Sequence, residues 1–211
     1  MAVLNPASVP LSLYIHMPWC VRKCPYCDFN SHAVPDGALS AELEQTYLKA
    51  LVADFETQVE MAQGRSIHSV FIGGGTPSLI SAKGYAWLFE QLKSLLNFED
   101  DCEITLEANP GTLEHDPFAG YLEAGINRLS IGVQTFNTDH LQKLGRIHSA
   151  NNAMDAIEQA RQAGFKRVNV DLMHGLPEQT LEQALYDLKT AVEQGATHIS
   201  WYQLTIEPNT V

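Results

Sequence analysis

Short apolar runs alternate with longer amphipathic stretches along most of the chain. The runs are bounded by polar residues, glycine or proline, which is typical of buried strands. They lie at 11–16, 70–72, 104–106, 128–133, 168–172 and 199–204. The stretches between them repeat apolar residues at helical spacing. The sequence therefore predicts six strands alternating with five helices, a pattern that requires a parallel sheet with right-handed crossovers.

The helices are predicted from their apolar stripes and from capping signals. Asp116-Pro117 is expected to supply the N-cap and the first residue of a short helix. Thr180-Leu-Glu-Gln183 has the spacing of a capping box. The positions expected to be buried are Leu39, Leu43, Tyr47, Leu51, Phe55 and Val59; Tyr85, Leu88, Phe89, Leu92 and Leu96; Ala153, Ala156, Ile157 and Ala160; and Leu181, Leu185, Leu188 and Val192.

Six strand–helix units favour an incomplete (β/α)6 barrel of the TIM type over a doubly wound sheet, although periodicity alone is compatible with both. The barrel is expected to span residues 11–211, after an N-terminal segment at 1–10 and with a turn at 35–37. The sequence stops just after the sixth predicted strand. One wall would be open and its apolar edges exposed.

Composition and charge limit which binding partners and which cellular compartment are compatible with the sequence. The formal net charge is −12, from 25 acidic and 13 basic residues, which disfavours binding to nucleic acid. No apolar run approaches membrane-spanning length, and the first ten residues lack the pattern of a secretory signal. Four cysteines without an export signal indicate a reducing, cytoplasmic setting. Cys102 has the surroundings of an ordinary strand residue.

Three cysteines follow the first predicted strand at the spacing C-x₃-C-x₂-C: Cys20, Cys24 and Cys27. They cannot all pair as disulfides, and together they form a soft thiolate ligand set. A [4Fe–4S] cluster has four irons that each need a ligand, usually a cysteine thiolate. Three cysteines would leave one iron open to a small molecule.

Other uses of the three cysteines remain open at this point. Cys24-Pro-Tyr-Cys27 matches a redox-active C-x-x-C pair, but this reading leaves Cys20 unexplained. A structural zinc site could recruit His16 or His32 as its fourth ligand, although such sites usually show two separated ligand pairs. The three thiols could also simply be buried.

Polar residues and glycines gather where the predicted strands end, which is where parallel α/β folds place their ligand sites. Gly73-Gly-Gly-Thr76 follows the second strand and would expose bare backbone to a ligand. Glu107 could bind a ligand ammonium group, and Asp171 could accept hydrogen bonds from ribose hydroxyls. Arg146 could donate two parallel hydrogen bonds to a ligand carboxylate. Taken singly, each of these residues more often has a structural role than a functional one. His148 and His174 are expected to be loop or core histidines rather than iron ligands.

The combined motifs resemble the radical S-adenosylmethionine family. Tyr26 precedes the third cysteine, as an aromatic residue does in that family's signature. Further motifs resemble the oxygen-independent coproporphyrinogen III oxidase group, and the last two in this series resemble its heme-chaperone branch: 14–20 YIHMPWC, 73–77 GGGTP, 107–110 EANP, 130–134 SIGVQ, 144–146 LGR, 171–177 DLMHGLP, 27–32 CDFNSH and 201–209 WYQLTIEPN.

The resemblance implies an open [4Fe–4S] cluster that binds S-adenosylmethionine (SAM) and cleaves it reductively. Each proposed contact is carried over from the matching motif. Tyr14 would lie near the sulfonium and Tyr26 near the adenine. The remaining contacts implied are Gly74, Gly75, Thr76 and Glu107 to the methionine amino end, Gln134 and Asp171 to the ribose, and Arg146 to the methionine carboxylate.

Two differences from the oxidase pattern favour a heme chaperone. The oxidase carries a fourth cysteine two residues beyond the third, and here that position is Phe29. The oxidase also has a longer N-terminal arm, whereas the first predicted strand here starts by Leu11. Because proteins of the heme-chaperone branch continue into a C-terminal domain, the resemblance also implies that this sequence is a fragment. The implied partners of a chaperone are heme, an electron donor and a heme-acceptor protein, which can be membrane-bound and reached by peripheral contact. Oxygen-independent coproporphyrinogen III oxidase is the alternative, so enzymatic activity is left open.

Overall fold

The computed structural model describes residues 5, 8–34, 38–111, 115–208 and 210; the predicted turn at 35–37 and most of the segment 1–10 lie outside that set. The main sheet has six strands: β1 (Leu11–Met17), β4 (Ile67–Gly74), β5 (Phe98–Ala108), β6 (Arg128–Gln134), β7 (Val168–His174) and β8 (His198–Gln203). All neighbouring strands in the sheet are parallel. The predicted strands and their direction are confirmed.

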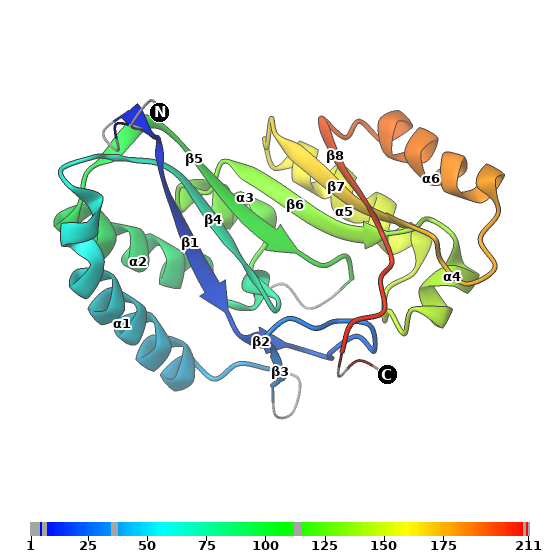
Figure 1. Ribbon diagram of the computed structural model, residues 1–211, viewed down its shortest axis with the longest axis horizontal. Helices are drawn as coiled ribbons and strands as arrows, with labels where there is room; N and C mark the ends of the chain where they lie inside the picture. Colours follow the sequence, from blue (N-terminus) through cyan, green and yellow to red (C-terminus); the bar gives the residue numbers. More distant parts are fainter. Residues whose placement is uncertain (1–4, 6–7, 35–37, 112–114, 209, 211) are drawn as a thin grey trace.

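The strand order separates a barrel from a doubly wound sheet. The order is β1-β4-β5-β6-β7-β8, so each new strand is added on the same side of the last. A doubly wound sheet would reverse direction at a switch point. In Figure 1 the strands run side by side from blue β1 to red β8, with the helices along one face of the sheet. The fold is an incomplete (β/α)6 barrel with β1 and β8 at the edges of the described sheet.

The helices are α1 (Ala41–Gln58), α2 (Ala82–Leu95), α3 (Phe118–Glu123), α4 (Thr138–Lys143), α5 (Ala150–Gln162) and α6 (Leu181–Glu193), with 3₁₀ turns η3 (Val59–Ala62) and η4 (Pro77–Leu79). The predicted stripe of α5 is fully confirmed, and that of α2 is confirmed for Tyr85, Leu88, Phe89 and Leu92. These residues join apolar strand residues in one continuous core. The Thr180–Gln183 capping box of α6 is also present.

The predicted buried stripe of α6 is wrong for three of its four residues, and only Leu188 packs against the core. Leu181 is 70% exposed and Val192 is 64% exposed. The face of α6 that packs inward instead carries Ala184, Asp187, Thr190 and Ala191. Asp187 is tolerated there because its Oδ1 accepts a hydrogen bond from the Phe136 amide at 2.7 Å. Helical periodicity identified an apolar stripe but did not show which face meets the sheet.

The stripe predicted for α1 is only partly correct. Phe55 is buried as predicted, but Leu43 is 40% exposed and Leu48, which was not predicted, is buried. An every-fourth-residue repeat drifts around a helix that has 3.6 residues per turn, so it cannot stay on one face over five turns.

Local structure also differs at three places. Asp116 does not cap α3: Pro117 occupies the N-cap position, and the Asp116 carboxylate accepts from the Ala82 amide at the start of α2, at 2.7 Å. Helix α4 is not among the helices predicted from the sequence. Strand β2 (Trp19–Cys20) pairs with β3 (His32–Ala33), which was not predicted. This last pairing joins the two ends of the cysteine loop.

No helix among the described residues is long and apolar enough to cross a membrane.

Candidate functional site

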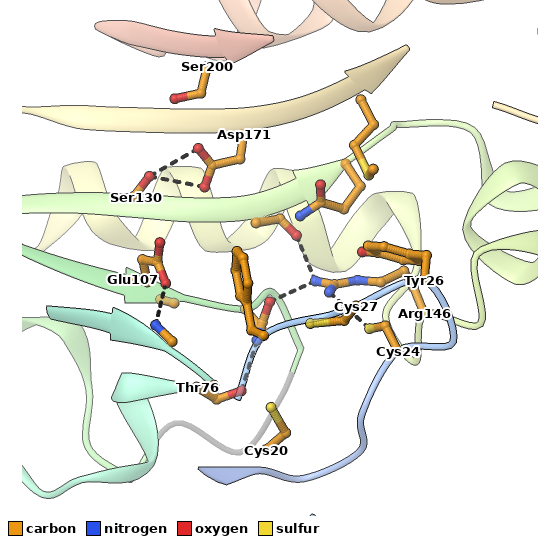
Figure 2. A pocket seen from close by; sticks show the side chains of 18 of the residues that line it. Cys20, Cys24, Tyr26, Cys27, Thr76, Glu107, Ser130, Arg146, Asp171 and Ser200 are labelled. Atoms are coloured by element: carbon orange, nitrogen blue, oxygen red, sulfur yellow. Dashed lines mark hydrogen bonds between the residues drawn. The ribbon is translucent and has the colours of Figure 1, made fainter. Parts of the chain in front are cut away.

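A cavity of about 550 Å³ lies at the carboxyl ends of the strands and extends into the barrel. Pockets of this size hold small molecules and cofactors. Figure 2 shows cysteines at one side of it and Asp171, Ser130 and Ser200 at the other. The predicted site residues that line the cavity are Cys20, Cys24, Tyr26, Cys27, Gly74, Gly75, Thr76, Glu107, Gln134, Arg146 and Asp171.

Tyr14 is the one predicted site residue that is not among those lining the cavity. It lies on β1 with its ring stacked against Phe71 at 6.4 Å between centroids. Its hydroxyl shares a hydrogen bond with His16 Nδ1 at 3.0 Å. A contact between Tyr14 and a ligand therefore stays a prediction.

The cysteine loop is fixed at both ends by backbone hydrogen bonds. The His32 amide donates to Pro18 O at 2.7 Å, and the Val34 amide donates to Cys20 O at 2.9 Å. Within the loop, the Lys23 ammonium donates to Phe29 O at 2.9 Å. All three cysteines are partly exposed and free, as thiols that are to bind a metal cluster must be.

Both ring nitrogens of His16 already have hydrogen-bond partners within the protein. Its Nε2 lies 2.8 Å from Asn30 O, and its Nδ1 meets the Tyr14 hydroxyl. Across the described residues, no three His, Cys, Asp or Glu side chains are gathered to hold a single ion. The geometry gives the zinc hypothesis no support through His16.

The glycine run has a packing role as well as an open backbone. A Cβ on Gly75 would lie 2.3 Å from Trp19 O and 2.9 Å from Met17 O. Gly74 has a φ of +110°, a conformation that favours glycine. The amides of Gly75 and Thr76 donate to Met17 O and Trp19 O, both at 2.6 Å. Because the glycines have no side chains, the end of β4 can pack directly against the backbone of the segment that precedes the cysteines.

We expect Gly75→Ala to displace this contact, because the new methyl group would meet backbone atoms that cannot rotate away. Its melting temperature should fall by several degrees, since overpacking typically costs about 1–3 kcal/mol. Gly120→Ala in α3 is the matched control, because the nearest atom to its Cβ would be 3.3 Å away. Equal melting temperatures for the two variants in a thermal unfolding measurement would contradict the packing argument.

Two carboxylates, those of Glu107 and Asp171, face the cavity. Glu107 Oε2 accepts from the Gly74 amide at 3.3 Å. Burial, and then the nearby Asp171 carboxylate, raise the pKa of Glu107 to about 7. Among the described residues, no ion pair joins either carboxylate to a basic side chain. A cationic ligand group would therefore find two acceptors here.

Asp171 belongs to a polar network that sequence reasoning missed. Ser130 Oγ donates to both of its carboxylate oxygens, at 3.1 and 3.0 Å. Asn169 Nδ2 donates to Asp171 Oδ1 at 2.7 Å and to Ser200 Oγ at 2.9 Å. Strand register places these residues together, since Ser130 pairs with Asn169 and Asp171 with Ser200. Alternating polar residues inside otherwise apolar strands were the signal for them.

Gln134 ends β6 in a left-handed backbone conformation with φ +68°. Such a conformation is uncommon for a residue other than glycine and is often found at functional sites. The side chain is 6% exposed, and its Oε1 accepts from the Tyr202 hydroxyl at 2.6 Å. Tyr202 was not predicted as a site residue, but it holds Gln134 at the cavity wall.

Arg146 reaches the cysteine loop. Its Nη1 lies 3.4 Å from Cys24 Sγ, and its Nη2 donates to Asn109 Oδ1 and to Gly132 O, both at 2.7 Å. Figure 2 shows the guanidinium group beside Cys24 and Tyr26. Asn109, which also donates to Thr76 Oγ1 at 3.0 Å, was missed because asparagine after a strand gives no distinctive signal.

His148 is a buried loop histidine, as expected. Its side chain is 4% exposed, and Nε2 lies 3.1 Å from Val133 O, which makes Nε2 the protonated nitrogen. Burial, and then the charge of Arg146, lower the pKa of His148 to about 4. The ring is therefore neutral near pH 7. His174 packs against Trp201, with 4.7 Å between the ring centroids.

The description "Radical SAM superfamily" belongs to a family model that matches residues 14–191. The chain belongs to this superfamily. The superfamily implies a [4Fe–4S] cluster and SAM. The donor set fits them, because three free thiols, the backbone of Gly74 and Gly75, and two carboxylates that form no ion pair among the described residues line one cavity.

The chain is also similar to named proteins. It is 56% identical over 206 residues to "Heme chaperone HemW" of Haemophilus influenzae, covering 98% of this chain and 54% of that protein. It is 53% identical to "Heme chaperone HemW" of Escherichia coli, covering 96% of this chain and 52% of that protein. The chain spans about half the length of these relatives.

Among solved structures, the radical SAM enzyme coproporphyrinogen III oxidase (HemN) from Escherichia coli aligns with a TM-score of 0.81 at 31% identity, covering 94% of this chain and 45% of that one. The resemblance to the radical SAM family and to its coproporphyrinogen oxidase group is confirmed, and so is the barrel fold.

Proposed function

We propose that Cys20, Cys24 and Cys27 hold a [4Fe–4S] cluster whose fourth iron is left for SAM. The observation that carries this proposal is that all three thiols line the same cavity as the glycine run and the two carboxylates. When bound, the cluster would supply the electron for reductive cleavage of the SAM sulfonium. A reducing cytoplasmic setting and an electron-donor protein would keep the thiols and the cluster functional.

The protein would hold SAM through residues on four strand ends. Gly74, Gly75, Thr76 and Glu107 are proposed for the amino end, and the buried position and raised pKa of Glu107 suit a cationic partner. Gln134 and Asp171 are proposed for the ribose. Asp171 is already held by Ser130 of the neighbouring strand β6, and Gln134 is held by Tyr202 of β8. Tyr26 is proposed for the adenine, Arg146 for the carboxylate, and Tyr14 for the region of the sulfonium.

For the protein as a whole we propose a heme chaperone that binds heme and passes it to an acceptor protein. Two observations support this choice over the oxidase. The relatives at 56% and 53% identity are named heme chaperones. In addition, Phe29, 56% exposed at the edge of the cavity, occupies the place of the fourth cysteine in the oxidase motif. A side chain without a donor atom cannot take over that cysteine's function.

The second candidate is oxygen-independent coproporphyrinogen III oxidase. It is favoured by the structural match to HemN at 31% identity. The same cavity and the same cofactors would serve it.

The two candidates differ in what they do with a porphyrin. The protein with its cluster is incubated without oxygen with coproporphyrinogen III, a reductant and SAM, and in parallel with heme and a heme-free acceptor. We expect heme to bind and to move to the acceptor, and no protoporphyrinogen to form. Steady production of protoporphyrinogen would move the assignment to the oxidase.

A further inference from the structure

The contact between Arg146 and Cys24 indicates a role for this arginine besides binding a ligand. A guanidinium group can bind a carboxylate through two parallel hydrogen bonds, either from Nε and Nη2 or from Nη1 and Nη2. Both arrangements use Nη2. Both hydrogens of Arg146 Nη2 are taken, one by Asn109 Oδ1 and one by Gly132 O, at 2.7 Å each. A bidentate grip on a ligand carboxylate would have to break one of these bonds.

Of the two other donor nitrogens, Nη1 is directed at a cysteine. It lies 3.4 Å from Cys24 Sγ, which is a hydrogen-bonding distance for sulfur. The two bonds of Nη2 come from the ends of β5 and β6, which are rigid parts of the sheet. The sheet therefore holds a fixed positive charge and an N–H donor against one of the three cluster cysteines.

We propose that Arg146 is a positioning residue that tunes the cluster through Cys24, in addition to any contact with SAM. This inference rests on the proposed cluster. Hydrogen bonds to cysteine sulfur and nearby charge are recognised controls on the reduction potential of iron–sulfur clusters. The reduced cluster carries one more negative charge than the oxidised cluster, so a cation and donor at Cys24 stabilise the reduced form more. Arg146 thus makes the cluster easier to reduce.

The test is a redox titration of the cluster without SAM, on anaerobically purified protein, followed by EPR spectroscopy. Arg146→Met, which removes the charge and every donor, should shift the midpoint potential to a more negative value. Arg146→Lys, which keeps the charge but not the planar fork, should fall between Met and the parent. A purely structural role would not order the variants by charge.

Arg128→Met is the matched control. Arg128 also lines the cavity, but its Nη1 donates to Thr105 Oγ1 at 3.2 Å instead of to a cysteine. Its removal should leave the potential closer to that of the parent than Arg146→Met does. Unchanged potentials in both Arg146 variants, with only SAM affinity reduced, would overturn the inference and leave Arg146 as a ligand contact alone. A parent protein without any cluster would instead refute the proposed function.

Discussion

Replacing Cys24 with alanine is expected to abolish the iron–sulfur cluster and to leave the barrel folded. With one thiolate lost, two of the four irons would lack a protein ligand, which an open cluster cannot tolerate. The apolar core is built from the strands and helices, and no residue between Cys20 and Ala33 belongs to it. Arg146 would lose one partner but keep its bonds to Asn109 and Gly132.

Iron and sulfide content and the visible absorption report the cluster, and circular dichroism with a thermal melt reports the fold. Cys102→Ala is the control, because Cys102 is buried in β5 outside the cavity lining; it should retain the cluster. Loss of helical signal in Cys24→Ala, at a temperature where the parent is folded, would show that the cysteine is structural.

Glu107→Gln is expected to weaken SAM binding by about 10- to 100-fold, because a hydrogen bond to a charged group is typically worth about 1.5–3 kcal/mol. In the parent protein, affinity should fall as the pH is lowered through about 7, where the Glu107 carboxylate takes up a proton and loses its attraction for an ammonium group. In the variant this step should disappear. Isothermal titration of SAM into the protein with its cluster, at several pH values, measures both effects.

The same substitution should stabilise the fold at high pH. Because the pKa of Glu107 is raised to about 7 in the folded protein, the folded state binds this proton more tightly than the unfolded state does. The carboxylate therefore lowers stability progressively as the pH rises from about 4.5 to 7, by up to about 3 kcal/mol. Glu107→Gln should melt above the parent at pH 8 and together with it at pH 4.5.

Glu90→Gln, at an exposed position of α2, should change neither SAM affinity nor the melting temperature. If Glu107→Gln bound SAM as the parent does at every pH, Glu107 would not be a contact of the ligand ammonium.

The parallel sheet could be predicted because its strands are short apolar runs that alternate with helices, a pattern that admits few topologies. The edge strand β8 was predicted in the same way although it has no buried residue. The site was predictable for a related reason: parallel strands bring their carboxyl ends to one edge, so Gly74, Glu107, Gln134 and Asp171 had to converge there. The strand order β1-β4-β5-β6-β7-β8, which excludes a doubly wound sheet, was not fixed by periodicity.

What could not be predicted depends on contacts between distant segments. The stripe of α6 was largely misassigned because small residues, with Asp187 bonded to the Phe136 amide, face inward in place of Leu181, Leu185 and Val192. Ser130 and Asn169 gave no signal individually, and only strand register brings them to Asp171. Arg146 joins β5, β6 and the cysteine loop, a meeting point that no local pattern encodes.

Metal analysis of the protein purified without oxygen decides whether the three thiols hold an open cluster. We predict about four irons and four sulfides per chain, no stoichiometric zinc, and an EPR spectrum of the reduced protein that changes when SAM is added. Stoichiometric zinc without sulfide, or an EPR spectrum that is the same with and without SAM, would contradict an open [4Fe–4S] cluster at Cys20, Cys24 and Cys27.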